Sequence, residues 1–233
     1  MTDIKFELTD WRYEVKFVVN TVEQRALENW ISNCKFLYRS FEDRTVNSLY
    51  FEDFSKSAIR DNLAGISSRK KNRIRWYGDA QNVPPSVFET KIKKGRLGRK
   101  GRIKLGLVEF DFYQKKEWQK SVLMPNMRDL HSKIHDLKSL EPSVLVSYER
   151  EYFNLLMGIR MTVDREIKTY DPKSEPNVFT HSRKPFSELI VEFKCSVEQI
   201  DYLSEILVSF PFRASRHSKF MTGSYYLNQL DFL

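Results

Sequence analysis

The sequence predicts an α+β fold in which helices cover the outside of a β-barrel with a charged interior. Segments that alternate charged and apolar residues recur along the chain, and several helical segments carry an apolar stripe. These helices need an apolar surface to cover, and only the apolar sides of the strands offer one large enough. The charged sides are then left facing one another inside a barrel. An open sheet with a solvated basic face is the alternative arrangement.

The clearest strands lie between residues 71 and 105. Arg73 and Arg75 bracket Ile74, and two further segments repeat this alternation. Side chains two residues apart on a strand share a face, so each strand presents one cationic side. Other strands are expected over residues 11–20, 44–52, 143–153, 158–167 and 187–195. Three apolar residues fall on the charged side, namely Trp76, Val144 and Val146.

Helix signals alternate with these strands. Thr21 begins a helix with Gln24 as its capping-box partner, and Ser196 and Gln199 repeat that pattern before another helix. The remaining helices are expected near residues 55–64, 108–120, 126–140 and 218–230. We therefore expect a lead-in over residues 1–10 and a single domain over residues 11–233.

The composition favours a soluble, cytoplasmic protein with an anionic ligand. The net charge of +8 suits nucleic acid, polyphosphate, nucleotides or an anionic membrane surface. Cys34 and Cys195 lie far apart without metal-binding spacing, as reduced thiols of a cytosolic protein do. No apolar run approaches the length of a membrane span, and the charged N-terminus has no signal-peptide core.

A barrel interior lined with like charges is costly unless something fills it. A phosphate chain would fit, because each phosphate accepts several charge-assisted hydrogen bonds from arginine and lysine. A minority of inward carboxylates also suits Mg²⁺ or Mn²⁺, which bind through one or two carboxylates plus substrate phosphates.

Nine motifs, in order along residues 12–220, resemble those of the VTC domain. They are RYEVKF (12–17), SLYFED (48–53), RIRWYG (73–78), FETK (88–91), KGR (100–102), SYER (147–150), RMTVDREI (160–167), ELIVEFK (188–194) and SKF (218–220). The VTC domain is the polyphosphate polymerase member of the triphosphate tunnel metalloenzyme (CYTH-like) superfamily. The chain looks like its compact, stand-alone bacterial form.

This resemblance implies an antiparallel tunnel barrel of about eight strands. It implies transfer of the terminal phosphate of ATP to polyphosphate, with release of ADP and a requirement for Mn²⁺ or Mg²⁺. ATP, pyrophosphate and polyphosphate are the expected ligands. Direct membrane insertion is not expected, although a membrane-protein partner would allow export of the product. No oligomeric state is predicted.

The resemblance also implies roles for individual residues. Glu192 would be the metal ligand, and the catalytic residues would be Lys219, Glu192, Lys91 and Arg150. Substrate would be bound by Lys16, Arg60, Arg73, Arg75, Lys91, Lys100, Tyr148, Arg150, Arg160 and Lys219. The hydrolases of the superfamily begin with an ExExK strand, and Arg12 replaces its first glutamate here. The loss of one metal-binding carboxylate favours the polymerase.

Two other functions stay open. A triphosphate hydrolase of the same superfamily would need a group to orient water, which Glu14 or Glu89 can supply. A non-catalytic binder of polyphosphate or nucleic acid would need only the basic charge. Nucleic acid is not expected, because the aromatic residues are not interleaved with the cations. His131 and His135 lie four apart on an expected helix, but without a third ligand nearby we interpret them as surface residues.

Overall fold

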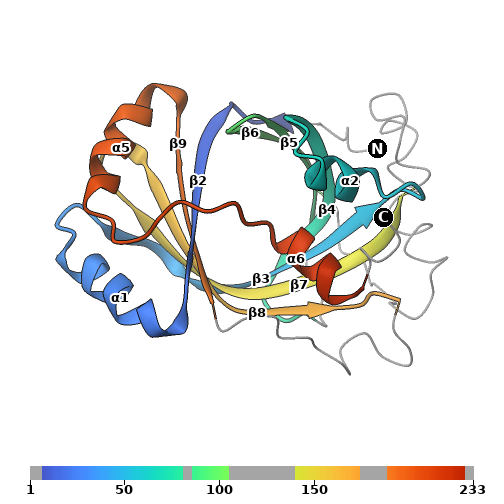
Figure 1. Cartoon of the computed structure of the whole chain (residues 1–233), viewed down its shortest axis with the longest axis horizontal. Helices are drawn as coiled ribbons and strands as arrows, with labels where there is room; N and C mark the ends of the chain where they lie inside the picture. The colour runs from blue at the N-terminus through green and yellow to red at the C-terminus, as the bar shows by residue number, and fades with distance from the viewer. Residues whose placement is uncertain (1–6, 81–85, 105–139, 174–187, 229–233) are drawn as a thin grey trace.

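The computed structural model describes residues 7–80, 86–104, 140–173 and 188–228 (Figure 1). Their strands form one sheet in the order β1-β6-β2-β9-β8-β7-β3-β4-β5, and all its strand pairs are antiparallel. The pairing of β5 with β6 closes eight of the nine strands into a barrel, which confirms the predicted fold class. The strands are β1 (Glu7–Leu8), β2 (Arg12–Val19), β3 (Tyr38–Glu52), β4 (Ser68–Tyr77), β5 (Val87–Lys94), β6 (Leu97–Lys104), β7 (Glu141–Asn154), β8 (Arg160–Tyr170) and β9 (Leu189–Cys195).

Two strands extend further than their sequence signals. Glu7 and Leu8, assigned to the lead-in, pair with β6 as the short strand β1. The strand expected over residues 44–52 begins at Tyr38, because its first residues follow β7 through two register shifts. Polar residues at this exposed end hide the alternation that marks a strand.

The described α-helices are α1 (Gln24–Asn33), α2 (Ser57–Leu63), α5 (Ile200–Val208) and α6 (Lys219–Tyr226). The helices expected over residues 108–120 and 126–140, with His131 and His135, lie outside the described residues. The first capping box is wrong by one position: Asn20 and Glu23 form it, so the chain turns one residue earlier. The second is confirmed at Ser196 and Gln199. Within the described ranges, no helix is long and apolar enough to cross a membrane.

Helices α1 and α5 cover the outside of the barrel, as predicted (Figure 1). Phe17 and Phe193 point outward from β2 and β9 into a cluster that includes Leu27 of α1 and Leu203 of α5. Phe210 packs edge-on against both phenylalanines, with ring centroids 4.6 and 5.2 Å away. Burial of this apolar surface fixes the outward side of the strands, so their charged neighbours must face inward.

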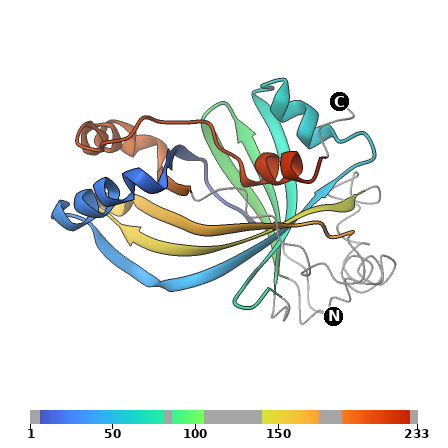
Figure 2. The same ribbon diagram turned by 60° about the horizontal axis from the view of Figure 1, so that its bottom comes forward.

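Helix α6 packs differently, against the inner side of the barrel. Phe220 contacts a cluster that contains Val144, Val146 and Tyr148 of β7, which share one face of that strand. Figure 1 and Figure 2 both place α6 on β7 and β8, at the opposite end of the molecule from α1 and α5. The two valines on the charged side are therefore explained: they form the floor on which α6 rests.

The inward placement of Trp76 was wrong. Trp76 follows Arg75 directly, so it shares the outward face with Ile74, and both are fully buried. Its indole N–H donates to the carbonyl oxygen of Asp79, 3.1 Å away.

Candidate active site

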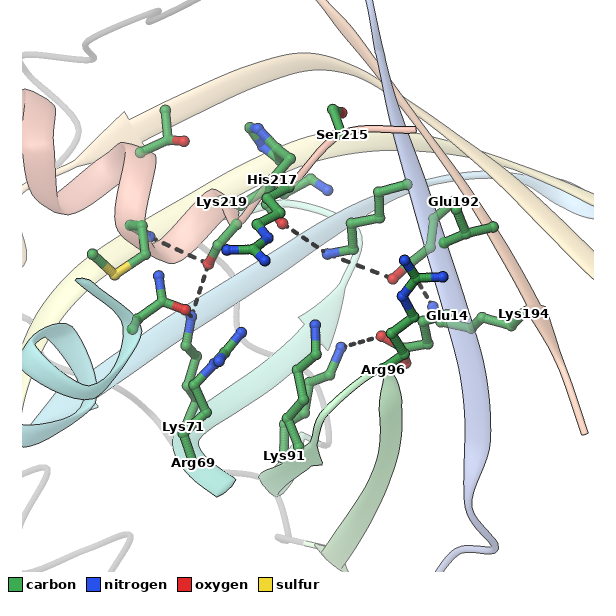
Figure 3. A pocket seen from close by; sticks show the side chains of 18 of the residues that line it. Glu14, Arg69, Lys71, Lys91, Arg96, Glu192, Lys194, Ser215, His217 and Lys219 are labelled. Atoms are coloured by element: carbon green, nitrogen blue, oxygen red, sulfur yellow. Dashed lines mark hydrogen bonds and ion pairs between the residues drawn. The ribbon is translucent and has the colours of Figure 1, made fainter. Parts of the chain in front are cut away.

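A cavity of about 1000 Å³ lies within the barrel, and we call it the basic cavity (Figure 3). Side chains from β2, β4, β5, β6, β7 and β9 line it, together with residues 214–219. Among the described residues that line it, thirteen are lysine or arginine and two, Glu14 and Glu192, are acidic. The basic residues are Lys16, Arg69, Lys71, Arg73, Arg75, Lys91, Lys93, Arg96, Lys100, Arg150, Lys194, Arg216 and Lys219. Such a cavity fits a polyanion.

Residues 214–218, which we call the strap, run beside β2 and lead into α6. Ser215 N–H donates to the carbonyl oxygen of Lys16 (2.8 Å), and Val18 N–H donates to Ser215 Oγ (3.1 Å). Lys16 Nζ also donates to the carbonyl oxygen of His217 (3.2 Å). Because β6 pairs with β2 only at Arg12 and Tyr13, the strap occupies an edge of β2 that β6 leaves free.

The strap places Lys219 at the wall of the cavity. Lys219 Nζ forms an ion pair with Asp164 of β8 and lies 4.7 Å from the ring centroid of Tyr148. Arg150 donates two hydrogen bonds, of 2.5 and 2.8 Å, to the same carboxylate. Burial alone would raise the pKa of Asp164, but Arg150 and Lys219 hold that pKa below its ordinary value. Lys219, Arg150 and Tyr148, far apart in sequence, are thus brought together.

A buried carboxylate also fixes the arginines of β4, Arg73 and Arg75. Glu89 lies 2.5 Å from Arg73 and 3.6 Å from Arg75, and it also contacts Lys100 and Arg102, each at 3.2 Å. Burial favours its neutral form, yet Arg75 and Arg73 lower the pKa of Glu89 well below its usual range. A carboxylate held by four cations fixes their positions and is poorly placed to orient a water molecule.

Tyr148 is buried at the centre of the site, and its pKa is lowered to about 8. Burial opposes this shift, whereas the charges of Arg150 and Arg75 favour the phenolate and outweigh it. The guanidinium of Arg150 lies 5.1 Å from the Tyr148 ring. The pKa of the tyrosine hydroxyl therefore depends directly on the positive potential of the basic cavity.

Comparisons with known proteins agree with this architecture. A family model described as the VTC domain matches residues 11–228. The chain belongs to the VTC domain family.

No curated protein matches the chain. Among solved structures, a putative adenylyl cyclase of Hippeastrum, described as having a dominant triphosphatase activity, is 14% identical with a TM-score of 0.54 over 94% of this chain and 96% of its own. A protein of Pyrococcus horikoshii OT3 is 13% identical, with a TM-score of 0.50 over 94% and 99%. At these identities the two structures share the fold.

As a member of a tunnel metalloenzyme family, the VTC domain requires a place for a divalent ion, and its carboxylates fit one. Glu192 Oε1 is buried and accepts no hydrogen bond from the described residues, although Lys16 Nζ lies 3.5 Å away. Glu14 lines the same cavity and pairs with Lys91 at 2.6 Å. The described part of the chain gathers no three acidic, histidine or cysteine ligands. A hard ion here would take one or two carboxylates and complete its shell with phosphate oxygens.

Eight of the ten substrate-binding residues that the resemblance implies line the cavity. They are Lys16, Arg73, Arg75, Lys91, Lys100, Tyr148, Arg150 and Lys219. Two do not. Arg60 is exposed on α2 and donates to Ser55 Oγ at 3.1 Å. Arg160 is exposed at the start of β8, and burial first, then the charge of Arg160, lowers the pKa of the Arg12 guanidinium.

Several lining residues of the VTC domain were missed from the sequence. Alternation places Lys93 and Lys194 on the charged face of their strands, but they were given no role in binding; Lys71 lies two residues from Arg73, so the same alternation could have found it. Asp164 lies on the charged side of its strand, but its partnership with Lys219 depends on how α6 packs. Nothing local to the sequence shows that the strap crosses the cavity.

Proposed function

We propose that this VTC domain is a polyphosphate polymerase that transfers the γ-phosphoryl group of ATP to the end of a polyphosphate chain. The observation that carries the proposal is the placement of Lys219. Its amino group lies between Asp164 and the Tyr148 ring, at the wall of a cavity that thirteen basic residues of the described chain line. Membership of the VTC domain family supports the same reaction.

The chemistry needs positioning and charge neutralisation. An oxygen of the terminal phosphate forms a bond to the γ-phosphorus, the bond from that phosphorus to the β–γ bridging oxygen breaks, and its electron pair leaves with ADP. The attacking oxygen is already anionic, so no strong general base is required. Arg73, Arg75 and Arg150 bind the phosphate oxygens, and Lys219 stabilises the charge that develops on the transferring group.

A divalent ion, Mn²⁺ or Mg²⁺, would be held by Glu192, with Glu14 alongside, and would neutralise charge on the phosphate oxygens when bound. Lys16 and Lys194 flank Glu192, at 3.5 and 2.5 Å. These lysines keep the pKa of Glu192 well below its ordinary value despite burial, so its carboxylate stays ionised. We place the reaction in the cytoplasm, where ATP is available and where free thiols such as Cys34 and Cys195 persist.

Hydrolysis of a triphosphate is the second candidate. Glu14 favours it, because its carboxylate faces the cavity and can orient a water molecule. The Hippeastrum protein of similar fold is described as a triphosphatase. Against hydrolysis, Glu14 is already committed to Lys91, and Arg12 stands where the hydrolases carry their first glutamate.

Incubation with γ-labelled ATP and Mn²⁺, followed by gel separation, distinguishes these reactions. We expect label in long polymers, with one ADP formed per transferred phosphate, for the wild type and for the exposed-site control Lys35→Ala. Lys219→Ala should lose most of this activity, by about 100-fold or more, because a charged contact to the transferring group is removed. Release of the label as free phosphate alone would assign a hydrolase, and tight polyphosphate binding without turnover would assign a binding module.

A further inference from the structure

Lys71 of β4 connects three elements at one side of the basic cavity. Its Nζ lies 2.9 Å from Ser218 Oγ and 3.4 Å from Asn62 Oδ1 (Figure 3). The same nitrogen lies 5.0 Å from the ring centroid of Phe220. Ser218 is the N-cap of α6, and its Oγ also accepts a hydrogen bond from Met221 N–H. The lysine therefore contacts the end of the strap, one residue before Lys219.

The surroundings of Lys71 are cationic. The basic groups that face it are Lys16 of β2, Arg69 of β4, and Lys91 and Lys93 of β5. Among the described residues, no carboxylate lies within ion-pair distance of its Nζ. Glu52 of β3 interacts electrostatically with Lys71, and burial raises the pKa of Glu52 to about 7, so this carboxyl is only partly ionised at neutral pH.

An amine in this position resists protonation while the cavity holds no anion. Burial first, and then repulsion by Lys16 and Lys91, lowers the pKa of Lys71 well below its ordinary value. The hydrogen bonds from Lys71 Nζ to Ser218 Oγ and Asn62 Oδ1 need no charge on the amine, because an amine donates in either protonation state. A bound phosphate chain shifts Lys71 toward the ammonium form, because its negative charge offsets the positive charges of the neighbouring lysines.

We propose that Lys71 is a further binding residue for the phosphate chain, one that takes up a proton from solvent when the anion enters the cavity. The inference rests on the proposed function only for the nature of its ligand. The amine exchanges its contacts with Ser218 and Asn62 for phosphate oxygens, and the proton that it gains stays on Nζ. Binding of the polyanion by this residue is thus coupled to proton uptake.

Isothermal titration calorimetry with inorganic tripolyphosphate tests this coupling without turnover. Titrations at about pH 8, above the usual titration range of histidine, in two buffers of different ionisation enthalpy, give the number of protons taken up on binding. The variants are Lys71→Met, which cannot bind a proton, and Lys71→Arg, which is always charged. Lys70→Met is the matched control, because Lys70 is an exposed lysine on the other face of β4.

We expect the wild type and Lys70→Met to bind with equal affinity and equal proton uptake. Lys71→Met should bind about tenfold more weakly or worse and should take up fewer protons, because one charged hydrogen-bonding group is lost. Lys71→Arg should bind more tightly than Lys71→Met while keeping its reduced uptake. Lys93, Lys100 and Lys194, whose pKa values are lowered mainly by burial, and the Tyr148 phenol, whose pKa of about 8 the anion should raise, account for the uptake that remains.

Wild-type affinity and proton uptake in Lys71→Met would overturn the inference and leave the proposed function intact. Reduced affinity with unchanged proton uptake in both variants would overturn the coupling. Failure of the wild type to bind tripolyphosphate would instead overturn the proposed function, and the inference with it.

Discussion

Lys219 and Asp164 form a buried ion pair that joins the first residue of α6 to the middle of β8. The Asp164 side chain is 0% exposed and that of Lys219 is 9% exposed. Arg150 shares the same carboxylate. One aspartate therefore fixes two cations of the candidate active site, and it does so across elements that are distant in sequence.

Asp164→Asn should destabilise the fold and also slow the reaction. Removing the charge leaves Arg150 and Lys219 buried without their partner, which costs about 3–5 kcal/mol in comparable sites. Chemical denaturation measures this loss. Tripolyphosphate should stabilise the variant more than the wild type, because the anion can take the place of the missing carboxylate between the two cations.

Asp201→Asn, on the exposed side of α5, is the control and should change the free energy of unfolding by less than about 0.5 kcal/mol. If Asp164→Asn unfolds like the wild type, with the same response to tripolyphosphate, the ion pair does not hold the site together.

Glu14 makes stability depend on pH in the acid range. Burial would raise its pKa, but Lys91 lowers the pKa of Glu14 to about 2. Its unfolded pKa is about 4.3, so its contribution is complete above that pH and is lost as the pH falls through about 2. Glu14→Gln should therefore cost about 3 kcal/mol near neutral pH and almost nothing near pH 2.

Urea titrations over a pH series measure this difference in the free energy of unfolding. Glu42→Gln, at an exposed position on β3, should run parallel to the wild type throughout. A constant gap between Glu14→Gln and the wild type at every pH would show that the Lys91–Glu14 pair does not shift the pKa of this carboxyl.

The barrel and most of its basic lining could be predicted from the sequence, because both follow from alternation along single strands. Arg73, Arg75 and Lys91 face inward for the same reason that Ile74 faces outward. The closure of the cavity could not be predicted in this way. Lys219 meets Asp164 only because α6 enters the barrel over Val144 and Val146, and this packing depends on the shape of a surface built from several strands.

Tyr148 offers a direct readout of the basic cavity. Its phenol should ionise with a pKa of about 8 in the free protein. Bound tripolyphosphate should raise that pKa toward its ordinary value of about 10, because the anion offsets the charges of Arg150 and Arg75. The difference in ultraviolet absorbance between the wild type and Tyr148→Phe, followed against pH, isolates this residue from the other tyrosines. Unchanged ionisation in the presence of bound tripolyphosphate would place the anion away from Tyr148.

Gly223 tests whether the seating of α6 controls the position of Lys219. A Cβ at residue 223 would lie 2.7 Å from Val144 Cγ1 and 3.2 Å from Thr169 Cγ2, so the helix or its floor must move. In an exposed helix, glycine to alanine stabilises by about 1 kcal/mol. Here Gly223→Ala should instead destabilise by about 1–3 kcal/mol through overpacking, and turnover should fall as Lys219 leaves Asp164.

Val144→Ala removes the atom that the new methyl group would strike, so the double variant provides the decisive comparison. We expect the double variant, Gly223→Ala with Val144→Ala, to lose about 1 kcal/mol less in free energy of unfolding than the two single variants lose together. It should also recover part of the lost turnover. Additive losses in both measurements would mean that α6 does not rest on Val144. A recovery of stability without any recovery of turnover would mean that the height of α6 above β7 does not set the position of Lys219.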